Sequence, residues 1–250
     1  MSAAEYVYAV VPADVEVDPE ARGLGDPPLP VQLIRHREIA ALVSEIDADR
    51  PLGRPDDLVA HERLLDATAA EVPVLPIRFG AVVAGAGAVV DEFLEPHHDK
   101  FKQALDELDG HAEYIVKGRF VEEAVLNEAV RENPEVARLR GAIRGKPEEA
   151  TRNERMRLGE IVNQAIEAQR RTATRTLVEV LNQHAVAVSE REPSHELDAG
   201  NVAALVETAH EGELVKALEG VAGDWDGKVR LRLLGPLAAY DFVSTMRPGE

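Results

Sequence analysis

The spacing of apolar residues predicts strands at the start of the chain. Residues 6–11 (YVYAVV) contain no polar gap, which is typical of a buried strand. Residues 12–30 hold five prolines and two glycines and predict a loop. Residues 31–34 predict a short strand. Residues 39–46 fit one face of a helix and also one face of a strand, and we favour the strand.

Two helices are predicted farther along the first half. Pro55 begins one, because a proline at the first helical position loses no hydrogen bond. Its apolar stripe falls on Leu58, His61, Leu65, Thr68 and Val72. Residues 72–79 (VPVLPIRF) predict an extended segment whose prolines suit a sheet edge. Residues 86–108 predict the second helix, with an apolar face of Val90, Phe93, Leu94, Phe101, Leu105 and Leu108.

The second half predicts the element order β-α-β-β-α-β. Strands are expected at 112–117, 186–191, 202–206 and 229–234, with Gly235-Pro236 ending the last one. A helical stretch over 120–184 is broken at Asn133-Pro134 and at Gly145-Lys146-Pro147. A short helix carries Leu214, Leu218 and Val221. This is the order of a ferredoxin-like fold, but the first crossover is far longer than the roughly dozen residues that it needs. The surplus predicts extra packed helices or a helical arm.

The fold class expected from these elements is α+β with two domains. Residues 1–110 would form an N-terminal α+β domain. Residues 111–250 would form a modified ferredoxin-like domain with a helical arm at about 120–184. A shift in charge supports a boundary near Gly110: residues 1–110 hold 22 acidic and 9 basic residues, and residues 111–250 hold 24 and 19.

Composition narrows the possible partners and chemistry. The net charge of −18 argues against nucleic acid and against anionic membranes, since both require a basic surface. Cysteine is absent, which excludes disulfides and thiol chemistry and fits a cytoplasmic protein. The start of the chain lacks a basic secretory n-region. The apolar run at 81–90 is also too short to span a bilayer, which takes about 20 residues.

Candidate chemical sites are few. The glycines at 80, 85 and 87 follow a strand but lack a phosphate-loop pattern. His97-His98 could suggest a metal, but adjacent helical residues point about 100° apart, so a solvated or capping pair is favoured. His61 is expected to be a hydrogen-bonded core residue. Arg78 would cap or pair with a buried acid, or bind a ligand carboxylate. The apolar stripe of the helix at about 147–184 would pack internally or bind a partner. We expect no catalytic residues, no cofactor and no metal.

Three segments together resemble the GvpF/GvpL family of gas vesicle proteins. They are the opening YVYAVV, the central His61-Glu62 followed by VLPIRFG at 74–80, and the closing GPLAAYDFV at 235–243. Ala238-Ala239 departs from the prolines that the family often has there. The motif positions that the resemblance singles out for structure or interaction are His61, Pro76, Arg78, Phe79, Gly80, Trp225, Gly235, Pro236, Tyr240 and Phe242.

The resemblance implies a function that composition does not reveal. Members of the family are minor components or assembly factors of gas vesicles and are not enzymes. They are thought to bind the very hydrophobic shell protein, together with other accessory proteins, and to limit its aggregation while a vesicle nucleates. This implies a cytoplasmic protein associated with the vesicle. The runner-up is a small-molecule-binding regulatory module in which Arg78 anchors an anion.

Overall fold

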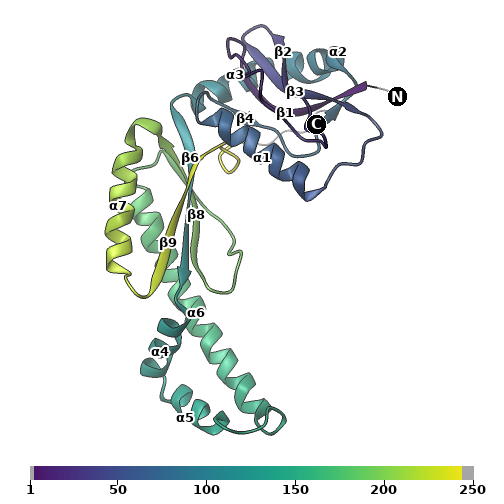
Figure 1. Ribbon diagram of the computed structural model, residues 1–250. Coiled ribbons are helices and arrows are strands. Elements are labelled where there is room, and N and C mark those ends of the chain that lie inside the picture. The colour runs from purple at the N-terminus through teal and green to yellow at the C-terminus, as the bar shows by residue number, and fades with distance from the viewer. Residues whose placement is uncertain (1–2, 244–250) are drawn as a thin grey trace. The chain divides into compact units, whose positions relative to one another are not determined.

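The computed structural model describes residues 3–243, except for the side chains of Ala129 and Glu132. It is a mixed α/β structure with two antiparallel sheets (Figure 1). Contacts divide it into two compact units. The first unit contains the described residues up to Tyr114, Leu205–Ala209 and the residues from Gly235 onward. The second contains Ile115–Ala204 and His210–Leu234.

The first sheet is built around strand β1 (Ala3–Pro12). Its order is β2 (Gln32–His36), β3 (Ile39–Asp47), β1 and β4 (Leu75–Pro76), and β5 (Val82–Val83) also pairs with β1. Strands β1 and β3 pair along their whole length, with a shift in register between Val7 and Ala9. Residues 4–11 are all buried, which explains the run without a polar gap. The strands predicted at 6–11 and 39–46 are therefore confirmed.

Helices α1 (Pro55–Ala69) and α3 (Glu95–Leu108) belong to the same unit. A short helix α2 (Ala86–Ala88) and a π-helical turn η1 (Val89–Leu94) lead into α3, so the predicted helix at 86–108 is confirmed. The predicted stripe of α1 is wrong at Leu58, whose exposed fraction is 43%. The helix instead buries Asp57, His61 and Leu65, because the carboxylate of Asp57 pairs with Arg50 at 2.6 Å.

The second sheet has the strand order β7-β8-β6-β9. These strands are β6 (His111–Phe120), β7 (Ala187–Glu190), β8 (Asp198–Glu207) and β9 (Val229–Leu237). Helix α7 (Glu211–Asp224) lies between β8 and β9 in the chain, after the short turn η3 (Thr208–His210). The prediction that Gly235-Pro236 ends the last strand is wrong. Strand β9 continues to Leu237, since a proline is tolerated on the edge strand of a sheet.

The long crossover between β6 and β7 is helical throughout most of its length. It contains α4 (Glu122–Glu132), α5 (Pro134–Ile143), the turn η2 (Glu149–Thr151) and α6 (Arg152–Leu181). The predicted breaks are confirmed. The side chain of Asn133 caps α5 by accepting from the amide of Glu135 at 2.9 Å, and Gly145 adopts a φ of +74°.

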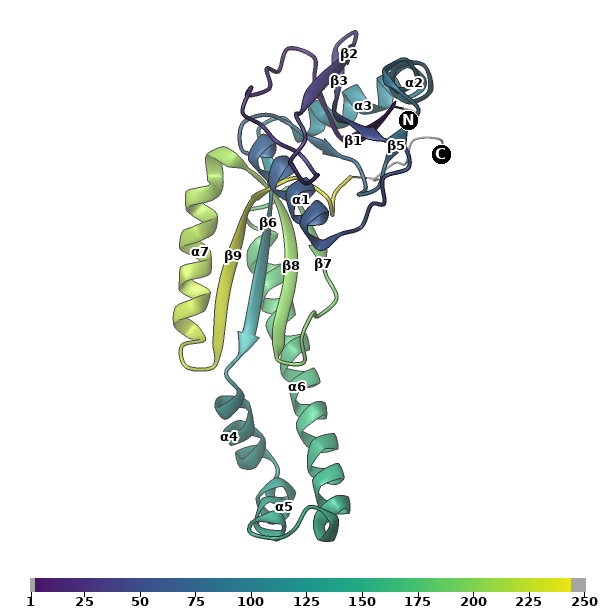
Figure 2. The same ribbon diagram turned by 45° about the vertical axis from the view of Figure 1, so that its right-hand side comes forward.

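Figures 1 and 2 show α4, α5 and the first half of α6 extending beyond the end of the second sheet. This helical arm has a small core of its own, made by Val136, Leu139 and Ile161. The rest of α6 packs on the sheet, where Ile166 and Ala173 join Phe120, Ala199 and Val229 in one hydrophobic cluster.

Candidate functional site

The motif residues of the three segments converge in the core of the first unit. The hydroxyl of Tyr6 lies 3.0 Å from Nδ1 of His61 and accepts a hydrogen bond from the amide of Gly80 at 3.1 Å. The ring of Phe79 stands edge-on to both Tyr6 and His61, with centroids 5.9 and 5.6 Å away. Tyr8 completes the cluster with its centroid 4.8 Å from that of Tyr6. Tyr6, Tyr8, His61 and Phe79 thus form one polar-aromatic cluster, to which Gly80 contributes its amide.

Burial controls the protonation of this cluster. It lowers the pKa of His61 to about 4, and the Ile77 carbonyl opposes the shift only in part. Burial likewise raises the pKa of Tyr6. At neutral pH the imidazole is therefore uncharged and Tyr6 keeps its proton. Because His61 is only 1% exposed, this is the arrangement of a core hydrogen bond, as expected from the sequence, and not that of a solvent-accessible base.

The closing segment packs against the same core. The amide of Ala238 donates to the carboxylate of Asp66 at 3.3 Å, and the amide of Asp241 donates to Glu113 at 2.9 Å. Burial, followed by the charge of Asp66, raises the pKa of Tyr240. The Tyr240 hydroxyl is buried and has no hydrogen-bond partner within residues 3–243.

The remaining motif positions of this unit also have structural surroundings. Pro76 pairs with Ala9 in the first sheet. Gly235 has a φ of +144°, and a β-carbon there would come within 2.5 Å of the Tyr114 ring. Phe242 lines a hollow beside Leu75, together with Phe101, Leu108 and Leu205.

The side chain of Arg78 is exposed, unlike the buried Ile77 before it. A carboxylate bound to it would stay in water, where an ion pair contributes little. The structure therefore gives no enclosed anion site at this position.

The interpretation of His97-His98 as a solvated or capping pair is wrong for His98. Its ring is buried, with Nε2 2.9 Å from the Glu38 carboxylate and Nδ1 3.0 Å from that of Asp99. The reason is that α3 turns this position towards the interior with Phe101 and Leu105. Across the described part of the chain, no three histidine or acidic side chains gather as metal ligands do.

Trp225 lies in the second unit and lines a groove of about 390 Å³. Helices α4 and α6 contribute much of its wall, and the turn between α7 and β9 contributes Trp225 and Lys228. The apolar lining consists of Phe120, Ala124, Val125, Ala168, Ala173, Trp225 and Val229. Gln169 also lines the groove, and its Nε2 is buried without a hydrogen-bond partner in the described structure. This feature was missed at the sequence level, because its residues come from four separate segments.

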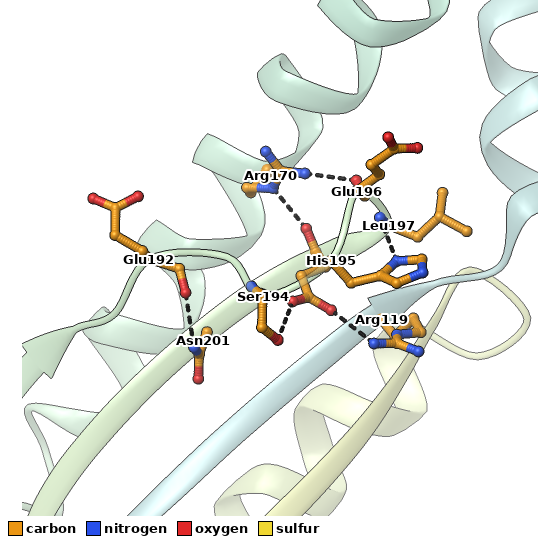
Figure 3. Close-up of polar contacts among 9 residues, drawn as sticks. Arg119, Arg170, Glu192, Ser194, His195, Glu196, Leu197 and Asn201 are labelled. Atoms are coloured by element: carbon orange, nitrogen blue, oxygen red, sulfur yellow. Dashed lines mark hydrogen bonds and ion pairs between the residues drawn. The ribbon is translucent and has the colours of Figure 1, made fainter. Parts of the chain in front are cut away.

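A polar network beside the groove ties the loop between β7 and β8 to α6 (Figure 3). Asp198 accepts from the amide and hydroxyl of Ser194 at 2.8 and 2.9 Å and pairs with Arg119 at 3.3 Å. Burial by itself would raise the pKa of Asp198, but the hydrogen bonds from Ser194 and Arg119 outweigh it and lower the pKa. Arg170 of α6 donates to the carbonyls of Asp198 and Glu196 at 2.7 and 2.6 Å. The network fixes the loop and thereby the position of α6 on the sheet.

Comparison with known proteins identifies the family. A family model described as gas vesicle synthesis protein GvpL/GvpF matches residues 4–244. The chain belongs to the GvpL/GvpF family. Gas vesicle protein F of Streptomyces sp. (strain CB03234) is 33% identical over 95% of this chain and 98% of the relative. Gas vesicle protein L of the same strain is 30% identical over 96% and 92%.

Solved structures agree in fold. The crystal structure of the gas vesicle protein GvpF from Anabaena sp. PCC7120 superposes with a TM-score of 0.76 at 22% identity, covering 100% of this chain and 99% of that one. That of GvpF from Microcystis aeruginosa gives 0.73 at 21% identity, covering 96% and 98%. Within residues 3–243, no helix combines the length and apolarity that crossing a membrane requires. The GvpL/GvpF resemblance drawn from the three motifs is thus confirmed, and a gas-vesicle-related role follows from it.

Proposed function

We propose that this chain is a non-enzymatic accessory or minor structural protein of gas vesicles that binds the hydrophobic shell protein. By holding shell subunits it limits their aggregation while a vesicle nucleates. Family membership supports the vesicle role. The observation that carries the binding role is the apolar groove between α4, α6 and Trp225.

The groove suits an apolar helix or strand of a partner. Much of its lining is apolar, and Trp is among the residues that most often dominate binding energy at interfaces. Glu128, Asp224 and Lys228 supply a polar rim, which is the usual anatomy of a binding patch. The free amide hydrogen of Gln169 can donate to a partner carbonyl, so a bound segment would satisfy a group that is otherwise unpaired.

The net charge of −18 supports the proposal that this chain limits the aggregation of shell subunits. A complex of an apolar subunit with a strongly negative protein is repelled by other such complexes, which opposes aggregation. The same charge disfavours membranes and nucleic acid as competing partners.

Co-expression of the shell protein with variants of the full chain tests this function. Ala168 is exposed and lines the groove, so Ala168→Arg should block the groove without disturbing the core. We expect the soluble, co-purified shell protein to fall at least about tenfold, the loss typical of a hot-spot position. Asn163→Arg adds the same charge at an exposed position of α6 outside the groove. This variant should capture as much shell protein as the unmodified chain. Equal capture by both variants would contradict the proposal.

We also propose that the second half of the chain is a modified ferredoxin-like domain that begins near residue 111, after an α+β domain at 1–110. Its support is the element order β6, α4–α6, β7, β8, α7, β9 together with the sheet order β7-β8-β6-β9. In this description the helical arm at about 120–184 is an enlarged first crossover, and the groove lies where that crossover leaves the sheet.

A further inference from the structure

The second sheet carries a cluster of basic side chains on one face. A β-carbon added at Gly118 of β6 would lie 3.3 Å from the side chains of both Val229 and Leu231 of β9. These residues therefore share a face, and Val229 and Leu231 belong to the cluster that packs against α6. Because side chains alternate along a strand, their neighbours point to the opposite face. These neighbours are Lys117 and Arg119 of β6 and Arg230 and Arg232 of β9.

The four basic residues, here called the basic sheet face, are poorly neutralised. Arg119, Arg230 and Arg232 are exposed. Arg119 pairs with Asp198 at 3.3 Å, whereas Lys117, Arg230 and Arg232 form no ion pair within residues 3–243. Like charges opposite one another on paired strands destabilise a sheet, so the arrangement favours an anionic partner over this face.

The first unit presents a segment with complementary charge. Asp14, Glu16, Asp18 and Glu20 alternate with Val15, Val17 and Pro19. The four acidic residues are exposed, while Val15 and Val17 pack against the core of the first unit. We call residues 14–20 the acidic segment.

The backbone of the acidic segment is held in place. Arg35 donates to the carbonyls of Ala13 and Val15 at 2.9 and 3.0 Å. Arg22 donates to the carbonyl of Pro19 at 2.8 Å. The carboxylates are thus displayed from a fixed backbone, which reduces the entropy lost on binding.

We propose that the basic sheet face binds the acidic segment of a second copy of this chain. The acidic segment is a loop with turns at its two ends, so the match to the basic sheet face is one of local charge. The net charge of −18 repels a second copy at long range. Salt screens this repulsion beyond a Debye length, whereas at contact the local basic cluster faces the acidic segment directly. The contact joins different surfaces of two copies, so it is heterologous and repeats from copy to copy unless a ring closes.

Sedimentation velocity of the full chain tests this inference. The sedimentation coefficient should rise with protein concentration at about 0.1 M salt and lose that dependence near 1 M, since the Debye length falls from about 10 Å to about 3 Å. Arg230→Glu with Arg232→Glu, and separately Asp14→Lys with Glu16→Lys, should each weaken self-association at least about tenfold. The control Arg140→Glu with Arg144→Glu changes charge equally at exposed positions of the arm and should associate as strongly as the unmodified chain.

Mixing the two reversed proteins is the decisive step. The unaltered acidic segment of one protein meets the unaltered basic sheet face of the other, and the two reversed surfaces are also complementary in charge. The mixture should therefore regain the salt-dependent association that each variant alone has lost. A chain that stays monomeric at about 0.1 M salt, or association that both reversals leave unchanged, would overturn the proposal. So would a salt-dependent compaction independent of concentration, which would place the contact within one copy. Binding to anionic vesicles or to a poly-glutamate peptide without self-association would assign the face to another anion and also overturn it.

Discussion

The Tyr6 hydroxyl lies 3.0 Å from Nδ1 of His61, although 55 positions separate the two residues in the chain. This bond joins strand β1 to helix α1, and the amide of Gly80 donates to the same hydroxyl at 3.1 Å. The hydroxyl oxygen of Tyr6 therefore links strand β1, helix α1 and the turn that contains Gly80. The role that follows for these motif residues is to hold the unit together.

Tyr6→Phe should destabilise the protein by about 1–3 kcal/mol. It leaves Nδ1 of His61, which is 1% exposed, without its partner in the interior, and an unsatisfied buried polar group costs about that much. Urea denaturation followed by circular dichroism measures the change. Tyr240→Phe is the matched control, because the Tyr240 hydroxyl has no partner among the described residues, and it should be neutral or stabilising. Equal losses for both variants would contradict the assigned bond.

Acidification should destabilise the protein through His61. The unfolded chain takes up a proton at this residue near pH 6.5, whereas the folded chain does so only near pH 4. The unfolded state therefore binds more protons between these values, and the free energy of unfolding falls as the pH decreases. The loss should reach about 2–3 kcal/mol at pH 4. Urea midpoints at several pH values measure it, and His61→Gln should lack this component. Parallel pH profiles for the two proteins would refute it.

Gly235→Ala should destabilise the protein by about 1–3 kcal/mol, the range for overpacked positions. The residue has a φ of +144°, and a β-carbon would come within 2.9 Å of the Glu113 carbonyl as well as striking the Tyr114 ring. Gly220→Ala in α7 meets open space and should stabilise by up to about 1 kcal/mol, as expected in a helix interior. Thermal unfolding of both variants checks the pair, and a harmless Gly235→Ala would count against the packing described here.

Asp198→Ala should release the loop between β7 and β8. The substitution removes the acceptor for the amide of Ser194 and the ion-pair partner of Arg119, at a cost of about 2 kcal/mol for hydrogen bonds to a charged group. Hydrogen exchange should accelerate across residues 191–198 while the first sheet keeps its protection. Unchanged exchange in the loop would show that other contacts hold it.

Much of the fold was predictable because its elements follow local patterns. The unbroken apolar run at 6–11, the proline at 55 and the breaks at Asn133 and Gly145 each act on the backbone near their own position. Errors arose where tertiary contacts decide the outcome. Leu58 is exposed because α1 buries the Arg50-paired Asp57 instead. Strand β9 continues past Pro236 because it lies at the sheet edge.

The candidate site was less predictable, since its residues meet only through the fold. The motif positions His61, Phe79 and Gly80 could be singled out by resemblance, but their common partner Tyr6 is visible only in three dimensions. The groove likewise depends on Gln169 and Trp225, which are 56 positions apart in the sequence. Hydrophobic periodicity marks Ile166 as core, yet it does not reveal the hollow beside it.

Isothermal titration of a soluble apolar segment of the shell protein into the full chain tests the central claim most directly. The account predicts saturable binding with a negative heat-capacity change, the mark of apolar burial, that persists at about 1 M salt, where the Debye length is about 3 Å. Ala168→Arg should abolish it and Asn163→Arg should leave it intact. Full binding by Ala168→Arg, or binding that disappears with salt, would contradict the account.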